Sequence, residues 1–437
     1  MKKVLIITYY WPPSGGSGVQ RWMYFAKYLS EFGYEPIILT VEPKYASYKF
    51  IDKSFVNKTE GIQVYRTKSS EPFNLYSSFI GKSKEEAIPQ AFAGESNPGL
   101  LQKLGRFVRG NFFIPDARIG WVRYAYNKAV ELLSNNDIQF VITSGPPHST
   151  HLVGLKLKKK FGVKWIADFR DPWTEVFYNK LFYRLNYAKV KDEKLEKAVL
   201  ENASTILTIG PSMAELLLKK ITNNAPTKNV EFVYNGYDQE VFKKLNSKIG
   251  NNKFVICHLG VLSDNQPIDS FVIAMKELIE VGLIKQEKVK ILLIGRIAPN
   301  IIDLIKKTLP SIELEVKNYM THNEAMQEIV NADLLFNSLA NVADGKYLIS
   351  GKLVEYIATG NPILCLGDSD GDGQKLLNEF ENAKVFDRND LNGIIEFIKN
   401  RFIEWEAGNN GNGINLEGKY SRRNMTGKLS EILSKIN

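Results

Sequence analysis

The chain has 437 residues, a formal net charge of +9 and 44% hydrophobic residues. This length exceeds what one compact core usually supports, so it predicts two domains. No apolar run reaches the roughly eighteen residues that a membrane-spanning helix needs, which excludes such a helix.

The positive charge favours anionic partners: phosphate-bearing substrates, nucleic acid or an anionic membrane surface. Nucleic acid ranks last, because zinc-finger spacing, an aromatic RNA-binding motif and a long basic run are all missing. Cys257 and Cys365 lie in apolar, strand-like runs, which predicts no disulfide and a cytoplasmic location. The first residues are typical of a strand rather than a signal peptide.

The chain begins with a predicted strand at 4–8, a helix at 19–29 and a strand from 37. Glycines in the first turn let the backbone approach a pyrophosphate at a helix N-terminus. Their spacing is not that of the dinucleotide fingerprint, and by themselves they favour a plain tight connection. The turn residues concerned are Gly15, Gly16, Ser17 and Gly18.

Residues 44–98 are weakly patterned, apart from a strand candidate at 62–65. Segment 100–114 predicts an amphipathic helix with basic residues beside its apolar stripe. Such a helix can lie in a membrane interface, but packing on its own domain with a solvated basic face is favoured. The stripe comprises Leu100, Leu101, Leu104, Phe107 and Val108, flanked by Lys103, Arg106 and Arg109.

Two further strands, at 140–143 and 164–168, each run into polar residues. The carboxyl ends of parallel strands are where α/β proteins place ligands. His148, after the first strand, can contact substrate hydroxyls or shuttle a proton, since its ordinary pKa is about 6.5. A helix-capping or plain loop histidine is an equal alternative.

The second half restarts the alternation at 254–259. Ser350 is a plausible N-cap for a helix on which Lys352 and Glu355 share one face. The positive helix end at Gly351 and the lysine favour phosphate, and Glu355, about 5 Å further along, can accept two ribose hydroxyls. An ordinary exposed Lys/Glu pair is equally compatible with this pattern.

Other candidates in this half are less distinctive. Arg296 follows a predicted strand at 289–294. The loop after the strand 363–366 has calcium-loop composition without the downstream glutamate, and the amide of Gly371 there either faces phosphates or solvent. His258 and His322 are interpreted as structural.

The segment Ser-Gly-Lys-Leu-Val-Glu-Tyr-Ile-Ala-Thr-Gly-Asn-Pro-Ile-Leu, at 350–364, resembles the nucleotide-sugar segment of GT-B glycosyltransferases, in particular the retaining family 4. Ser-Gly-Pro-Pro-His-Ser-Thr-His at 144–151 and Ala-Asp-Phe-Arg-Asp-Pro-Trp at 167–173 resemble a bacterial subgroup that serves cell-surface polysaccharide assembly.

The resemblance implies two Rossmann-like, doubly wound α/β domains that face each other across a cleft. Residues 1–229 would bind the acceptor and 230–423 the nucleotide sugar, with the final helix, 424–437, packing back on the first domain. The donor would be UDP- or GDP-linked and the acceptor a glycan or lipid-linked hydroxyl at the inner membrane. The resemblance further implies retention of configuration and no metal or other cofactor.

The resemblance also assigns individual residues. Glu355 would hold the ribose, and the Gly15–Gly18 turn would face the donor phosphates. Arg170 and Asp171 would border the acceptor, although Arg170 is also interpreted as a local brace to Asp168 or Asp171.

The sequence departs from the family where the donor pyrophosphate is usually held. Val261, after Gly260, replaces an arginine, and Asn265 with Gln266 occupy the region of a lysine. Lys352 or Arg296 would have to compensate. Tyr347 stands where the family usually has a second glutamate. Two alternatives therefore stay open: a nucleotide-sugar epimerase of the same fold, and a non-catalytic relative that binds nucleotide sugars.

Overall fold

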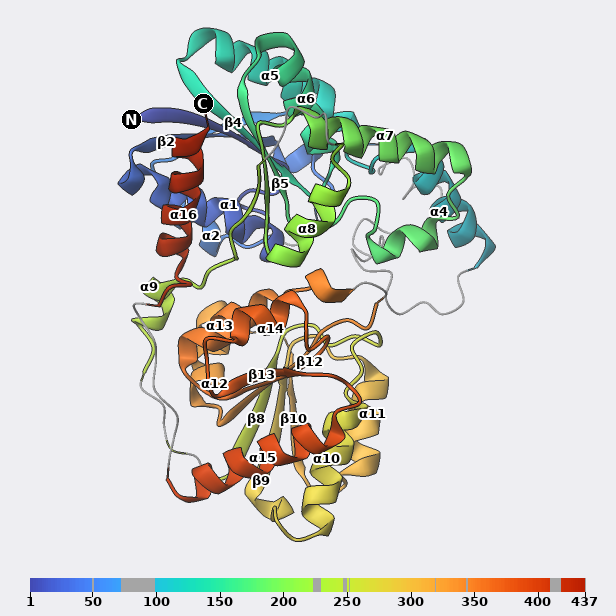
Figure 1. Cartoon of the computed structure of the whole chain (residues 1–437), viewed down its shortest axis with the longest axis vertical. Coiled ribbons are helices and arrows are strands. Elements are labelled where there is room, and N and C mark those ends of the chain that lie inside the picture. Colours follow the sequence, from blue (N-terminus) through green and yellow to red (C-terminus); the bar gives the residue numbers. More distant parts are fainter. Residues whose placement is uncertain are drawn as a thin grey trace. The chain divides into compact units, whose positions relative to one another are not determined.

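The computed structural model describes residues 1–48, 51–71, 99–222, 229–246, 250, 252–318, 320–342, 345–408 and 418–436. The chain divides into two compact units, which we describe one at a time (Figure 1). Unit 1 comprises Met1–Asn235 and Arg422–Asn437, and unit 2 comprises Gly236–Ser421.

Unit 1 is built on a seven-stranded parallel sheet with the order β3-β2-β1-β4-β5-β6-β7. The central β1 pairs with both β2 and β4, so that Leu5 lies opposite Ile37 on one side and Val141 on the other. Val4 to Ile7 are fully buried, as expected for a strand that helices cover on both faces. The strands are β1 Lys2–Thr8, β2 Tyr34–Val41, β3 Gln63–Thr67, β4 Ile138–Gly145, β5 Lys164–Phe169, β6 Thr205–Thr208 and β7 Val230–Phe232.

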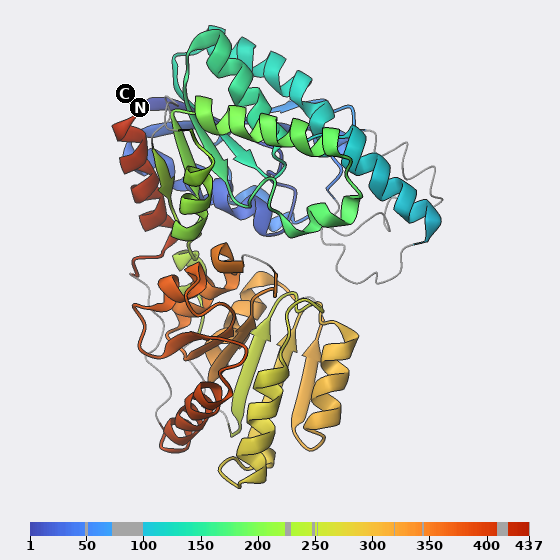
Figure 2. The same cartoon turned by 45° about the vertical axis from the view of Figure 1, so that its right-hand side comes forward.

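The helices of unit 1 form two groups, one with α1 and α16 and one with α5, α6 and α7, whose members pack on one another (Figures 1 and 2). Right-handed crossovers produce this division, because the chain leaves β1 toward one edge of the sheet and later crosses toward the other. The α-helices are α1 Ser17–Leu29, α2 Ser54–Asn57, α4 Leu100–Phe112, α5 Val122–Asn135, α6 Ser149–Phe161, α7 Asn186–Asn202, α8 Pro211–Lys219 and α16 Arg422–Lys435. The 3-10 helices are η1 Ser30–Phe32, η2 Pro43–Tyr45, η3 Ile119–Trp121 and η4 Phe177–Phe182.

The last helix returns to the unit that holds the N-terminus. Met425, Leu429 and Leu433 of α16 are buried at intervals of one helical turn. The Arg422 guanidinium lies 4.2 Å from the centre of the Tyr24 ring on α1 and donates a hydrogen bond to Gln20 (2.6 Å). Both apolar and polar contacts thus hold α16 against α1.

Unit 2 contains a six-stranded parallel sheet with the order β10-β9-β8-β11-β12-β13. The strand order reverses between β8 and β11, and ligands of such sheets bind beyond the carboxyl ends of the strands at this point. The strands are β8 Phe254–Leu259, β9 Val289–Ile294, β10 Glu313–Lys317, β11 Leu334–Ser338, β12 Ile363–Leu366 and β13 Ala383–Phe386.

One hydrophobic core of unit 2 joins its sheet to α10, α11 and α15. Phe271 of α10 stacks on Phe336 of β11 (ring centres 4.3 Å apart), and Phe402 of α15 meets Phe254 edge to face. The helices are α9 Gln239–Phe242, α10 Asp269–Glu280, α11 Pro299–Thr308, α12 His322–Asn331, α13 Gly351–Thr359, α14 Asp372–Leu377 and α15 Leu391–Glu406, with 3-10 helices η5 Gln286–Lys288 and η6 Gly345–Tyr347.

The predicted class, two doubly wound α/β domains, is confirmed by the two parallel sheets and their covering helices. The prediction for segment 100–114 is partly wrong. Arg106 is buried, whereas Leu100 and Leu104 of the stripe are 85% and 59% exposed. The basic face is therefore not fully solvated, and part of the apolar stripe faces outward. None of the described helices is both long and apolar enough to cross a membrane.

Candidate functional site

In unit 2, the loops that follow β8 and β9 are tied together at the point where the strand order reverses. The amide of Gly260 donates to the carbonyl of Ile294 (2.6 Å), and Leu262 donates to Arg296 (3.0 Å). Gly260 has φ +102°, which favours glycine. A Cβ atom on Gly295 would lie 2.6 Å from the Gly260 carbonyl oxygen, so the close approach of the two loops requires glycine there.

The helix α13 begins at the same edge, as the sequence predicts. The Ser350 hydroxyl accepts a hydrogen bond from the amide of Lys352 (3.4 Å), and Gly360 ends the helix in the left-handed conformation, with φ 69°. Leu353 and Ile357 are buried as the predicted apolar stripe. The capped first turn thereby places Lys352 beside the loop after β8 and Glu355 beside the start of α12.

The side chain of Lys352 crosses directly over Gly260. A Cβ atom at residue 260 would lie 2.5 Å from Cε of the lysine, so a glycine is needed for this path. The amine Nζ donates to the carbonyl of Val261 (2.9 Å) and lies 3.4 Å from Nε2 of His258. No carboxylate of the described residues forms an ion pair with Lys352. Burial lowers its pKa to about 8, and the charge of Glu355 opposes this shift.

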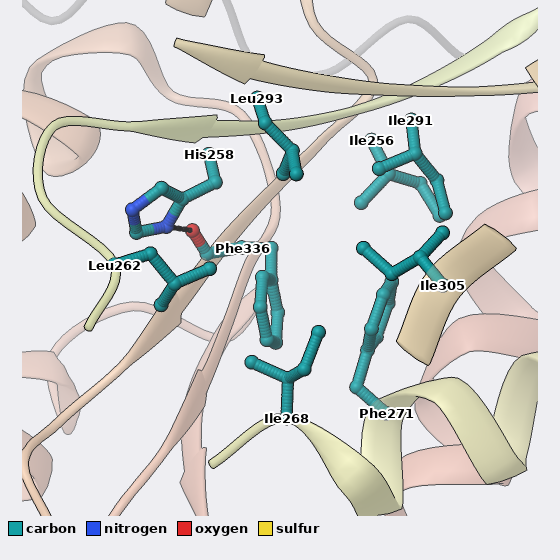
Figure 3. A pocket seen from close by; sticks show the side chains of 9 residues that line it. All are labelled: Ile256, His258, Leu262, Ile268, Phe271, Ile291, Leu293, Ile305 and Phe336. Carbon is teal, nitrogen blue, oxygen red and sulfur yellow. Dashed lines mark hydrogen bonds between the residues drawn. The ribbon is translucent and has the colours of Figure 1, made fainter. Parts of the chain in front are cut away.

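His258 is fully buried on β8 beneath the lysine. Its Nδ1 lies 3.0 Å from the carbonyl of Phe336 (Figure 3). A carbonyl only accepts, so Nδ1 carries the proton and Nε2 of the neutral ring offers a lone pair to Lys352. Burial and the lysine's charge lower the pKa of His258 well below its ordinary value. The ring borders a cavity of about 10 Å³, roughly one water in size. Its lining comprises Ile256, His258, Leu262, Ile268, Phe271, Ile291, Leu293, Ile305 and Phe336.

Glu355 lies one turn beyond Lys352 and meets a second histidine. Its Oε1 is 3.2 Å from Nε2 of His322, the first residue of α12. The sequence pattern indicates only structural roles for His258 and His322, yet the structure places each beside a predicted donor-binding side chain. A usable signal is that His322 opens a helix directly after β10, at the same edge of the sheet.

Two other predicted donor residues, Arg296 and Gly371, make no contact with the side chains of Lys352 or Glu355 among the contacts of the described residues. Arg296 is exposed at this edge, and its side chain makes no hydrogen bond or ion pair with the described residues. The amide of Gly371 donates to the carbonyl of Asp368 (3.0 Å), and its role toward donor phosphates stays a prediction. Among the described residues, no group of three or more metal-ligating side chains is found.

In unit 1, Arg170 ties together the loops that follow three strands. Its guanidinium donates to the carbonyls of Gly18 (2.6 Å), Gly145 (3.1 Å) and Pro146. It forms no ion pair with Asp168 or Asp171, so the expected brace exists but uses backbone oxygens. Gly16 precedes α1 with φ 87°. The roles of the Gly15–Gly18 turn and of Arg170 toward a substrate stay predictions.

His148 begins α6 but does not cap it with its side chain. The cap is Asp116, whose carboxylate accepts from the amide (2.8 Å) and hydroxyl (2.9 Å) of Ser149. The imidazole stacks on Trp173, with ring centres 5.1 Å apart, and it is only 6% exposed. Neither ring nitrogen makes a well-formed hydrogen bond to the described residues. Burial lowers the pKa of His148 to about 3, opposed by the backbone of Pro172. Its predicted catalytic role stays a prediction.

The lowered pKa of His148 makes the fold sensitive to acid. Between about pH 6.5 and 3 the unfolded chain binds a proton at this residue that the folded chain does not, so the free energy of unfolding falls as the pH falls. This residue should contribute a loss of about 2 kcal/mol at pH 5 relative to pH 7. We expect His148→Phe, which keeps a stacked ring, to reduce the pH dependence of urea unfolding by that amount. Equal pH dependence in both proteins would contradict this.

Asp171 differs from its neighbours because its side chain is exposed. Burial by the surrounding protein nevertheless raises the pKa of the Asp171 carboxylate, and the charge of Arg170 opposes this shift. Of the three predicted catalytic residues, His148 and Arg170 are enclosed by the loops of unit 1, and Asp171 is the most exposed residue. The structure brings His148 and Arg170 to one place through Gly145: a Cβ atom there would lie 2.9 Å from the His148 ring, and the Gly145 carbonyl accepts from Arg170.

No protein-family model and no curated protein matches the chain. Several solved structures match the chain. Trehalose-6-phosphate synthase OtsA matches with a TM-score of 0.63 at 11% identity, over 100% of both chains. Anabaena HepE, in complex with UDP and glucose, matches with 0.57 at 13% identity, over 99% of this chain and 100% of that one. The lipopolysaccharide outer core galactosyltransferase WaaB matches with 0.56 at 11% identity, over 99% of each. At these identities the likeness establishes the fold, which is the GT-B fold.

Proposed function

We propose that this protein is a glycosyltransferase of the family 4 type, which moves a hexose or related sugar from a UDP- or GDP-linked donor to a hydroxyl group. The observation that carries the proposal is the Lys352 amine held over Gly260, with Glu355 one helical turn beyond, at the reversal of the strand order in unit 2. A cation and the first turn of a capped helix suit a diphosphate, and a carboxylate at that distance suits a ribose.

The proposed reaction retains the configuration of the sugar and needs no metal or other cofactor. Lys352 and the amides of the first turn of α13 would stabilise the negative charge that develops on the leaving diphosphate. Support for a nucleotide sugar comes from HepE, which holds UDP and glucose. WaaB, a lipopolysaccharide outer core galactosyltransferase, supports a glycan or lipid-linked acceptor. We propose that the reaction serves cell-surface polysaccharide synthesis on the cytoplasmic side of the membrane.

The test is a calorimetric titration with UDP, UDP-glucose, GDP and GDP-mannose. Binding of one nucleotide series is expected, followed by slow release of the nucleoside diphosphate from its sugar-linked form. Binding of none of the four would remove the proposal.

A non-catalytic role as a binder of nucleotide sugars is the second candidate. It is favoured by the exposed Val261, which stands at the loop position where the family resemblance leads us to expect an arginine. The same titration separates the two functions, because a pure binder would bind one nucleotide series and release no diphosphate.

We further propose that unit 1 contacts an anionic membrane surface through the outward part of α4. Leu104 and Phe112 are exposed two turns apart. Beside them, exposed Leu185 and Tyr187 are joined to α4 through Asn111, which accepts from the Leu185 amide (2.7 Å) and from the Tyr187 hydroxyl. Figure 2 shows α4 and α7 side by side. Exposed apolar side chains grouped in this way are typical of an interaction surface.

A polar cavity of about 330 Å³ lies next to this surface and provides the matching charge. Of its seven lining residues, Lys180 and Lys189 are cations without an ion pair to the described residues, whereas Arg184 is paired with Asp192 (2.7 Å) and Glu193 is acidic. The two unpaired lysines favour a phosphate-bearing head group. Tyr183, at its edge, has φ 48°, a strained conformation for a residue other than glycine. The lining comprises Thr174, Asn179, Lys180, Tyr183, Arg184, Lys189 and Glu193.

Vesicle co-sedimentation tests this contact. The protein is expected to bind vesicles that contain phosphatidylglycerol and to bind pure phosphatidylcholine weakly. Leu104→Glu and Phe112→Glu should each weaken binding by roughly tenfold, because each removes apolar insertion and adds repulsion. Leu218→Glu, at an exposed apolar residue of α8, is the control and should have no effect. An equal loss in all three variants would contradict a role of α4.

A further inference from the structure

The amine of Lys352 is an unusual cation for a phosphate site, because both of its hydrogen-bond partners are neutral. One is the carbonyl oxygen of Val261 and the other is Nε2 of His258. The side chain cannot shift freely, since it passes over Gly260 with no room for even a Cβ atom. An ammonium ion held by two neutral acceptors retains its third N–H for a phosphate oxygen.

The groups that face this amine come from three elements. His258 on β8 is neutral, with its proton on Nδ1. Cys365 on β12 is a thiol, because burial raises its pKa to about 12. Glu355, on the lysine's own helix, contacts His322 rather than the amine. Glu355 thus carries the one negative charge near the amine among the described residues. Its attraction for the ammonium ion does not outweigh the cost of burying that charge, and the pKa of Lys352 is therefore about 8.

We infer that the donor diphosphate and a proton bind together at Lys352, with His258 as the positioning residue that holds the amine in place before the donor arrives. The step converts a neutral amine and one proton into an ammonium ion, and no bond of the donor changes. The diphosphate supplies the negative charge that the empty site lacks and so favours the charged form of the lysine. The inference rests on the proposed function, because it requires that the site bind a nucleoside diphosphate.

Calorimetry with UDP and GDP at pH 8.5, in two buffers of different ionisation enthalpy, measures the proton directly. Uptake should be roughly three quarters of a proton at pH 8.5 and about a tenth at pH 7, as follows from a free-site pKa near 8. The affinity should be constant below about pH 7.5 and fall toward tenfold per pH unit above about pH 8. Lys352→Arg, which is always charged, is expected to bind without uptake.

The role of His258 is tested by two variants. His258→Phe keeps the ring volume and removes the acceptor at Nε2, so the charged amine loses a partner. In His258→Phe, the affinity for UDP should therefore start to fall at a lower pH than in the wild type. At pH 7 this variant should bind UDP several-fold more weakly than the wild type. His258→Gln restores an acceptor and should shift the profile back toward the wild type. Circular dichroism confirms that each variant is folded.

The outcomes separate the inference from the proposed function. Tight binding of UDP or GDP with no proton uptake at pH 8.5 would overturn the inference and leave the proposed function standing. A wild-type pH profile in folded His258→Phe would overturn the positioning role. Absence of binding of both nucleotides at every pH would remove the proposed function, and the inference with it.

Discussion

Replacing Glu355 by alanine is expected to weaken binding of UDP or GDP by about 30-fold, or about 2 kcal/mol, which corresponds to the loss of two hydrogen bonds from ribose hydroxyls to a carboxylate. Isothermal titration calorimetry measures this change. The fold should be little affected, because the one partner of Glu355 among the described residues is His322, and both side chains are partly exposed, at 16% and 34%. Glu355→Gln, which keeps one oxygen acceptor, should bind with intermediate affinity.

The matched control is Glu381→Ala. Glu381 is an exposed glutamate of the same unit that precedes β13, at the amino end of that strand, and its side chain makes no hydrogen bond or ion pair with the described residues. Its removal should leave nucleotide binding unchanged. If Glu355→Ala bound the nucleotide as tightly as the wild type, the ribose assignment would be wrong, and the pair of Lys352 and Glu355 would be an ordinary feature of a helix surface.

Local sequence signals are sufficient to predict the helix α13 and the parallel sheets that position this site. Ser350, the apolar spacing of Leu353 and Ile357, and Gly360 define α13 from within one short segment, and the structure confirms each of them. The parallel sheets follow from buried runs such as Val4–Ile7 and from their alternation with helices. These features depend on residues that are close together in the chain.

The partners of the site residues depend on contacts between distant segments, and the sequence does not reveal them. Lys352 meets Val261 and His258 from more than ninety residues away. Arg170 uses carbonyl oxygens, which every residue possesses, instead of the acidic side chains that its neighbours suggested. The cap of α6 comes from Asp116, on a different loop from His148. In each case the partner lies far away in the sequence, and only the folded structure brings it next to the side chain.

The largest effect on stability is expected for Asp168→Ala. Asp168 is fully buried at the end of β5 and accepts hydrogen bonds from Arg21 (3.0 and 3.2 Å), the Trp22 indole (2.7 Å) and the Ser144 hydroxyl (2.9 Å). Removing the carboxylate leaves the buried guanidinium of Arg21 without its opposite charge. Breaking one partner of a buried ion pair costs about 3–5 kcal/mol of unfolding free energy, which urea unfolding measures.

Asp171→Ala is the comparison that separates support of the fold from contact with a substrate. Asp171 is a carboxylate three residues further along, and it is exposed, so its removal should change the unfolding free energy by no more than about 0.5 kcal/mol. If Asp171 borders the acceptor as proposed, the variant should bind UDP or GDP normally and transfer sugar slowly. Equal stability losses in the two variants would contradict the buried network around Asp168, because Asp171 is neither fully buried nor part of that network.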